Sequence, residues 1–105
     1  MANEFKLTED ARQDLKEIWI YIAEFSPNSA DKKLREFKEK FQLVASNPKI
    51  GRSHDDLIIN LRSFPHKDHI IFYFQVENGV EIYRILHGAR NIEDLFENYF
   101  EGLKP

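Results

Sequence analysis

The feature that most constrains the fold is a pair of strand-like runs joined by Asn78-Gly79. Residues 68–76 (DHIIFYFQV) and 80–86 (VEIYRIL) are rich in β-branched and aromatic side chains, which favour strands. Asn-Gly between two such runs is typical of a two-residue turn that reverses the chain. The sequence therefore predicts an antiparallel β-hairpin in the second half of the chain.

A two-residue turn at Asn78-Gly79 also predicts which residues share a face, because directly paired residues point the same way. On one face it places Ile70, Phe72, Phe74, Tyr83 and Ile85, with Phe72 opposite Ile85 and Phe74 opposite Tyr83. The other face pairs Tyr73 with Arg84, Ile71 with Leu86, and Gln75 with Ile82. Since both faces are largely apolar, we expect helices to cover the first. We expect a C-terminal helix or another protein to cover the second.

Two amphipathic helices precede the hairpin. Thr8 before Glu9 and Asp10 is typical of a helix start, and Ser26-Pro27 marks a second one. Apolar residues then recur at helical spacing, at Ala11, Leu15, Ile18, Trp19 and Ile22 in the first helix and at Ala30, Leu34, Phe37, Phe41 and Val44 in the second. Asn47-Pro48 ends the pattern, so we predict a helical hairpin.

The remaining segments complete the predicted order β-α-α-β-β-β-α. We expect a strand over residues 3–7, a loop over 48–60, a short strand over 61–64 that ends at Pro65, and a helix that begins at Asn91. The predicted fold class is α+β: an N-terminal strand, a helical hairpin packed on a small antiparallel β-sheet, and a short C-terminal helix. A chain of 105 residues has the size of one domain, so we expect residues 1–105 to form a single unit.

Composition excludes several classes of function. The absence of cysteine rules out disulfides, a thiol nucleophile and Cys-ligated zinc, and it fits a reducing cytoplasm. No apolar run approaches the roughly 20 residues that cross a bilayer, so no membrane partner is expected. The formal charge of -3 argues against a protein that grips nucleic acid directly. We expect a cytoplasmic protein with protein partners.

Cationic side chains nevertheless gather on the predicted sheet or at its ends: Arg62, Lys67, Arg84 and Arg90, with His66, His69 and His87. If they converge, they suit metal-free phosphodiester cleavage, in which cations hold the phosphate and histidines move protons. The alternative for Arg84 is stacking on Tyr73 and an ion pair with Glu97 or Glu101 of the last helix. The alternative for the segment from His87 to Arg90 is an ordinary polar loop.

Other candidate motifs are weaker. His66 and His69 lie three residues apart at a strand entry, where alternation points them in different directions, so we expect no metal site. Ser53-His54-Asp55 is contiguous in the sequence, whereas a catalytic triad is a spatial arrangement. No glycine-rich phosphate loop is present. We expect no metal and no cofactor.

Several stretches together resemble one family. LTEDARQDLKEIWIYIAEFSP, SNPKIGR, LRSFP and IFYF followed by NGVEIYRILHGAR occur in this order over about residues 5 to 91. The chain is identified as similar to the ParE toxins of the RelE/ParE superfamily. The resemblance implies the toxin of a bacterial type II toxin–antitoxin module, with a helical hairpin on a small antiparallel sheet.

The family likeness also implies partners. An antitoxin wraps such toxins with its C-terminal segment and often binds its own operator DNA, so nucleic acid is contacted only indirectly. ParE-type members poison DNA gyrase by protein binding, while RelE-type relatives cut mRNA on the ribosome. The acidic chain and its HGAR ending favour the non-enzymatic gyrase poison with a ParD-like antitoxin. The alternatives are a ribosome-dependent nuclease that uses Arg62, Arg84 and His87, or an antitoxin-binding module without toxicity. The expected target- or antitoxin-binding residues are Arg62, Ile71, Tyr73, Ile82, Arg84, Leu86, His87 and Arg90.

Overall fold

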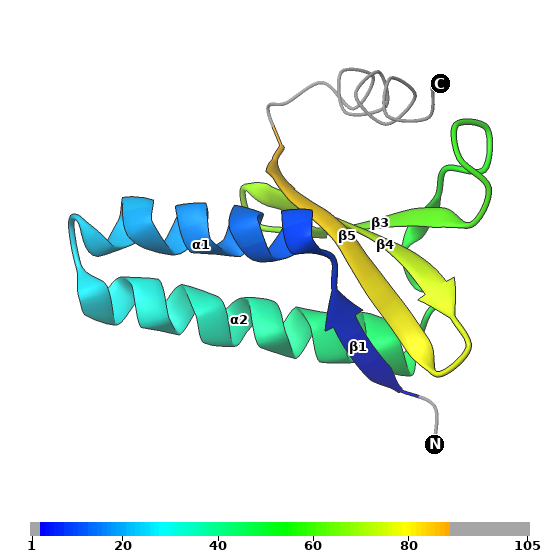
Figure 1. The fold of residues 1–105 in the computed structure, drawn as a ribbon, viewed down its shortest axis with the longest axis horizontal. Helices are drawn as coiled ribbons and strands as arrows, with labels where there is room; N and C mark the ends of the chain where they lie inside the picture. Colours follow the sequence, from blue (N-terminus) through cyan, green and yellow to red (C-terminus); the bar gives the residue numbers. More distant parts are fainter. Residues whose placement is uncertain (1–2, 89–105) are drawn as a thin grey trace.

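The computed structural model describes residues 3–88, which form a five-stranded sheet with a helical hairpin on one side (Figure 1). The elements in chain order are β1 (Glu4–Leu7), α1 (Glu9–Ala23), α2 (Pro27–Ser46), β2 (Arg52–Ser53), β3 (Leu61–His66), β4 (His69–Val76) and β5 (Gly79–His87). The strand order is β1-β5-β4-β3-β2. The α+β class and the helical hairpin are confirmed, although β1 runs parallel to β5 and the sheet is therefore mixed.

Both helices begin at the predicted caps. The Thr8 side chain accepts a hydrogen bond from the Ala11 N–H at 3.0 Å, and the Ser26 side chain accepts one from the Ser29 N–H at 3.2 Å. These bonds satisfy amide groups that have no partner within the first helical turn. The chain thus enters each helix at a fixed point, and the two helices pack against each other and against the sheet. No helix within residues 3–88 has the length and apolarity that crossing a bilayer requires.

The main core lies between the hairpin and the sheet. Phe37, Phe41 and Val44 of α2 are buried there against Ala11 of α1 and against the inner face of β4 and β5. Each fully buried side chain of this size contributes roughly 1.5–3 kcal/mol relative to exposure. This packing fixes which face of the sheet is inside.

The predicted register of β4 and β5 is wrong. The two loop residues are Glu77 and Asn78, because Val76 already pairs with Gly79. A β-bulge then shifts the ladder between Phe72 and Tyr73. The resulting pairs are His69 with His87, Ile70 with Leu86, Ile71 with Ile85, Phe72 with Arg84, Tyr73 with Ile82, Phe74 with Glu81, and Gln75 with Val80.

The helices cover the face of β4 that we expected to be the second one, and the bulge brings Ile85 of β5, and not Arg84 or Leu86, onto this covered face. The side chains beneath the helices are Ile71, Tyr73, Val80, Ile82 and Ile85. The opposite face carries Leu61, Phe72 and Leu86, packed with Leu57, Ile58, Ile70, Phe74 and Tyr83. We call these eight residues the second face. Leu57 and Ile58 come from the segment between β2 and β3, so part of the cover that we expected from a C-terminal helix comes from this loop.

Smaller differences concern the strand ends. The expected loop over residues 48–60 contains the two-residue strand β2, which pairs with β3. Strand β3 continues through Pro65 to His66, and only Lys67 and Asp68 separate it from β4. The helix predicted from Asn91 lies outside the described residues.

Candidate functional site

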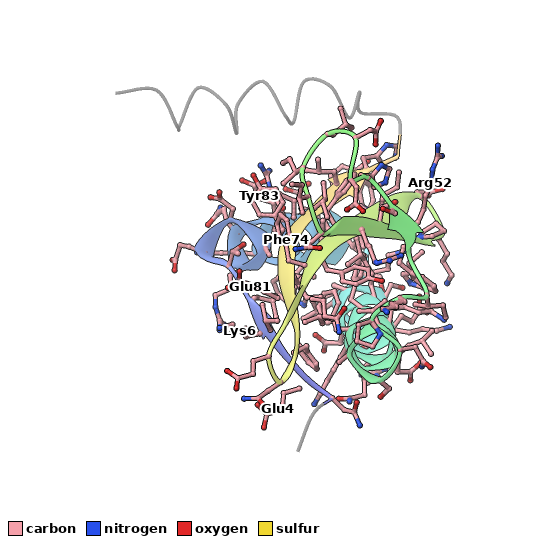
Figure 2. The ribbon with its side chains drawn as sticks, turned by 90° about the vertical axis from the view of Figure 1, so that its right-hand side faces the viewer. Glu4, Lys6, Arg52, Phe74, Glu81 and Tyr83 are labelled. Atoms are coloured by element: carbon pink, nitrogen blue, oxygen red, sulfur yellow. The ribbon has the colours of Figure 1, made fainter. Side chains whose placement is uncertain are left out.

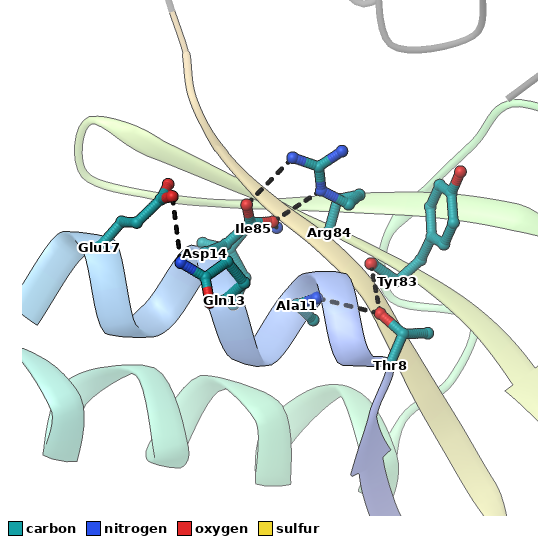
Figure 3. A network of polar contacts seen from close by, with 8 residues as sticks. All are labelled: Thr8, Ala11, Gln13, Asp14, Glu17, Tyr83, Arg84 and Ile85. Carbon is teal, nitrogen blue, oxygen red and sulfur yellow. Dashed lines mark hydrogen bonds and ion pairs between the residues drawn. The ribbon is translucent and has the colours of Figure 1, made fainter. Parts of the chain in front are cut away.

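Beyond its pairing with β1, the edge of β5 forms hydrogen bonds with Thr8, which precedes α1, and with α1 itself (Figure 3). β1 pairs with β5 only as far as Ile82. Thr8 then donates from its N–H to the Ile82 carbonyl at 3.0 Å and from its hydroxyl to the Tyr83 carbonyl at 2.7 Å. Further along, Asp14 of α1 accepts the Ile85 N–H at 2.9 Å. An acidic side chain thus takes the place of a neighbouring strand.

Asp14 also holds Arg84. The Arg84 Nε donates to Asp14 Oδ2 at 2.8 Å and its Nη2 donates to Oδ1 at 3.0 Å. This is a bidentate ion pair, the strong form of an arginine–carboxylate contact. The Asp14 side chain is only 9% exposed and that of Arg84 20%. The hydrogen bond from Asp14 raises the pKa of Arg84, so the guanidinium stays charged. The ion-pair partner of Arg84 is therefore Asp14. Its cross-strand neighbour on β4 is Phe72 and not Tyr73, as the predicted register had it.

Arg62 fixes the chain that follows α2. Its Nη1 donates to the Gly51 carbonyl at 2.7 Å and to the Lys49 carbonyl at 3.3 Å. Tyr73, its cross-strand partner, donates its hydroxyl to the Pro48 carbonyl at 2.8 Å and accepts the Gly51 N–H at 2.9 Å. Burial raises the pKa of the Tyr73 hydroxyl. These two side chains hold the loop in place.

The structure does not bring Arg62 and Arg84 together. Arg62 pairs with Tyr73, whose side chain points toward the helices, whereas Arg84 pairs with Phe72 on the second face. β4 separates their strands, and each guanidinium donates to a protein group of its own. The pocket of converging cations that a phosphodiesterase requires is not formed by these two residues.

Three of the expected partner-binding residues are inaccessible. Ile71, Tyr73 and Ile82 are each 0% exposed beneath the helices. Leu86 lies on the second face, as expected, and His87 is exposed at the end of β5. Arg90 lies outside the described residues. The reason for the correction is that the helices cover the face that carries Ile71, Tyr73 and Ile82, whereas we expected them to cover the face of Phe72 and Phe74.

The histidines at the β3–β4 turn face the same side, contrary to our expectation. His66 and His69 pair directly across the two-residue turn, and both rings meet the Phe37 ring edge-on, with centroids 5.2 and 5.6 Å away. Burial lowers the pKa of both histidines, so both favour the neutral form. Within residues 3–88 no cluster of three or more potential ligands for a metal ion occurs.

An ion pair supports this turn from α2. Glu36 accepts from Lys67 Nζ at 2.9 Å and contacts His66 Nε2 at 3.2 Å. The hydrogen bond from Lys67 lowers the pKa of Glu36. Lys67, one of the cations predicted on the sheet, therefore anchors the turn to the helix.

Ser53, His54 and Asp55 do not form a triad. His54 Nε2 lies 2.7 Å from the hydroxyl of Ser63 on β3, and burial lowers the pKa of its ring. The Asp55 carboxylate instead accepts the Asn60 N–H at 2.8 Å. These contacts organise the loop that leads into β3.

The second face presents aromatic surface. Phe74 and Tyr83 lie side by side on it, with ring centroids 5.5 Å apart (Figure 2). Both side chains are only partly buried, while Phe72 and Leu86 beside them are buried. Partly exposed aromatic side chains beside buried apolar ones are typical of protein-binding surfaces.

A second surface lies between α1 and the ends of β4 and β5. We call it the α1 groove, a hollow of about 610 Å³ in which Ile18, Tyr21 and Ile22 of α1 face Ile85 and Leu86 of β5. Its other lining residues are polar or charged, at Asp14, Glu17, Lys33, Asp68, His69 and His87. α1 forms one wall of the hollow, and Asp68 of the turn between β3 and β4 also lines it; Figure 1 shows this turn near α1.

Asp14 is the residue that sequence reasoning missed. It lies between Ala11 and Leu15, within the apolar stripe of the first helix, where a carboxylate is costly unless it is paired. Arg84 interrupts an apolar strand in the same way. Asp14 and Arg84 carry opposite charges, and each interrupts an otherwise apolar pattern. This is the sequence feature that could have predicted that they pair.

Comparisons with known proteins agree with the fold. The family model for the ParE toxin of the type II toxin–antitoxin system, parDE, matches residues 5–92. Curated relatives are the proteins named Toxin ParE1 from two strains of Mycobacterium tuberculosis, CDC 1551 / Oshkosh and ATCC 25618 / H37Rv. Each is 27% identical over 95 residues, which cover 89% of this chain and 97% of the relative.

A solved structure gives the same architecture. The chromosomal ParDE TA system from P. aeruginosa matches with a TM-score of 0.65 at 21% identity, over 80% of this chain and 94% of that one. At this identity the match shows the fold. The family model, in contrast, spans most of the chain, from β1 to beyond the end of β5. The chain therefore belongs to the ParE family of toxins of type II toxin–antitoxin systems.

Proposed function

We propose that this toxin acts by binding DNA gyrase and not by cutting RNA. The observation that carries the proposal is the internal use of both sheet arginines. Arg84 is bound by Asp14 and Arg62 by two backbone carbonyls, so neither guanidinium is positioned for a scissile phosphate. The acidic formal charge of -3 also weakens attraction to ribosomal RNA. This function places the toxin in the cytoplasm, where gyrase acts on DNA.

A cognate ParD-like antitoxin neutralises the toxin by laying a segment of its chain over the second face. Phe74 and Tyr83 are the side chains of that face with the most suitable chemistry, because aromatic rings bury large areas at small entropic cost. Leu86 and His87 continue this surface to the end of β5. Ile71, Tyr73 and Ile82 act only as core residues beneath it.

The target is tested with purified toxin in two assays. Supercoiling by bacterial DNA gyrase should be inhibited, and mRNA on translating ribosomes should remain intact. Cleavage of mRNA without inhibition of gyrase would instead support the nuclease alternative. A toxin that binds its antitoxin but affects neither process would be a binding module without toxicity.

The antitoxin surface is tested by a charge on the second face. Phe74→Asp should weaken antitoxin binding by at least about 30-fold, the size of effect seen when a central aromatic contact is lost. Ile50→Asp is the matched control, since Ile50 is 48% exposed and lies on the loop after α2. Equal affinity of both variants, measured by calorimetry on folded protein, would exclude the second face as the antitoxin site.

A further inference from the structure

The α1 groove is a surface that the antitoxin site does not explain. Its floor is apolar, formed by Ile18 and Ile22 from α1 and by Leu86 from β5. Tyr21 stands at the rim with 68% of its surface exposed, and its ring meets the exposed ring of Phe25 edge-on at 5.8 Å. Exposed aromatic side chains beside an apolar hollow are characteristic of contact sites for other proteins.

The shape of an occupant is limited by the closed edge of β5. A peptide could join the sheet as an added strand only if the backbone groups along that edge were free. Thr8 takes the carbonyls of Ile82 and Tyr83, and Asp14 takes the N–H of Ile85. The groove therefore suits an amphipathic helix whose side chains enter it, and not an additional strand.

The charges of the groove define the chemistry of that helix. Asp14 is neutralised by Arg84, whereas Glu17 and Asp68 have no Lys or Arg partner within residues 3–88. Lys33 is the cation that lines the groove, and its amine lies 5.5 Å from the centre of the Phe37 ring. Two carboxylates on opposite walls favour a helix with an apolar stripe flanked by Lys or Arg.

The groove also touches the proposed antitoxin surface. Leu86 belongs to the second face and also lines the groove, and the next residue, His87, lines the groove as well. A partner that covers Leu86 from the second face therefore hinders one that enters the groove. Neutralisation of a toxin requires such exclusion between the antitoxin and the target.

From these observations we propose that the α1 groove holds a cationic amphipathic helix of the toxin's target, and that the antitoxin blocks it through Leu86 and His87. This inference rests on the proposed function, so the target is DNA gyrase. Tyr21 is the anchor of the contact, and Glu17 and Asp68 pair with basic residues on either side of the bound helix.

The test uses full-length toxin variants in the gyrase supercoiling assay, with antitoxin affinity measured in parallel. Tyr21→Ala and Glu17→Lys should each raise the toxin concentration for half-inhibition by at least about tenfold. Their matched controls are Ile50→Ala and Glu39→Lys, which alter exposed residues outside the groove. Antitoxin affinity should change less than about threefold in all four, because none of the altered residues lies on the second face.

The outcomes separate the inference from the function on which it rests. Inhibition by wild type and controls, with loss in both groove variants, supports the groove as the target site. Inhibition by all five proteins alike overturns the inference and leaves the gyrase proposal standing. A wild-type toxin that does not inhibit gyrase overturns both. Loss of antitoxin binding in the groove variants would assign the groove to the antitoxin and overturn the inference.

Discussion

Removal of the Asp14 carboxylate is the most informative single perturbation of this fold. Asp14→Ala deletes two hydrogen bonds to Arg84 and leaves the Ile85 N–H at the edge of β5 without its acceptor. A buried backbone group without a partner costs about 1–3 kcal/mol. Loss of one partner of a fully buried ion pair costs about 3–5 kcal/mol.

The expected magnitude lies below the sum of these figures. The Arg84 side chain is 20% exposed, so water recovers part of the interaction that the guanidinium loses. We therefore expect Asp14→Ala to reduce the free energy of unfolding by about 2–4 kcal/mol. Arg84→Ala should cost about 1–3 kcal/mol, because Asp14 keeps its hydrogen bond to the Ile85 N–H.

Urea unfolding followed by the fluorescence of Trp19, the single tryptophan, measures these values. Glu17→Ala is the control on the same helix, where an exposed side chain should contribute within about 0.5 kcal/mol. The double mutant of Asp14 and Arg84 should reveal a coupling of about 1–3 kcal/mol. A cost of Asp14→Ala no larger than that of Glu17→Ala, or a coupling near zero, would refute this account of the β5 edge.

Three further predictions concern other parts of the fold. Tyr73→Phe leaves the Pro48 carbonyl and the Gly51 N–H without their partner and should cost about 2 kcal/mol in urea unfolding; an unchanged midpoint would show that the hydroxyl does not hold the loop. Gly79→Ala should destabilise the domain by more than about 2 kcal/mol in the same assay, because φ is +149° and an added Cβ would overlap a carbonyl oxygen of β1; a native-like variant would contradict the close approach of that strand. Burial lowers the pKa of His69 below the value of 6.5 in the unfolded chain, so the unfolded state binds more protons and stability should fall as the pH drops below about 6.5. His69→Phe should flatten this dependence in unfolding experiments at about pH 7.5 and 5.5, and an unchanged slope would remove His69 as its source.

The sequence by itself determined the elements and the family. Capping residues fixed both helix starts, since Thr8 and Ser26 act through bonds to their own helices. Apolar spacing placed Phe37 and Phe41 in the core. Local chemistry of this kind depends on neighbours in the chain, and so it can be read without a structure.

Only the tertiary structure decided the register and which face of the sheet the helices cover. Asn78-Gly79 indicated a tight turn, but Gly79 lies in β5, where its missing side chain lets β1 pass close by. That requirement comes from a strand more than 70 residues earlier, so no local pattern reveals it. The helices packed on the face of Ile71, Tyr73 and Ile82, which buried these residues and left part of Phe74 exposed on the other face. In the same way Arg84 found its partner in Asp14, 70 positions away, because long-range packing and not sequence proximity brings a buried charge to its counterion.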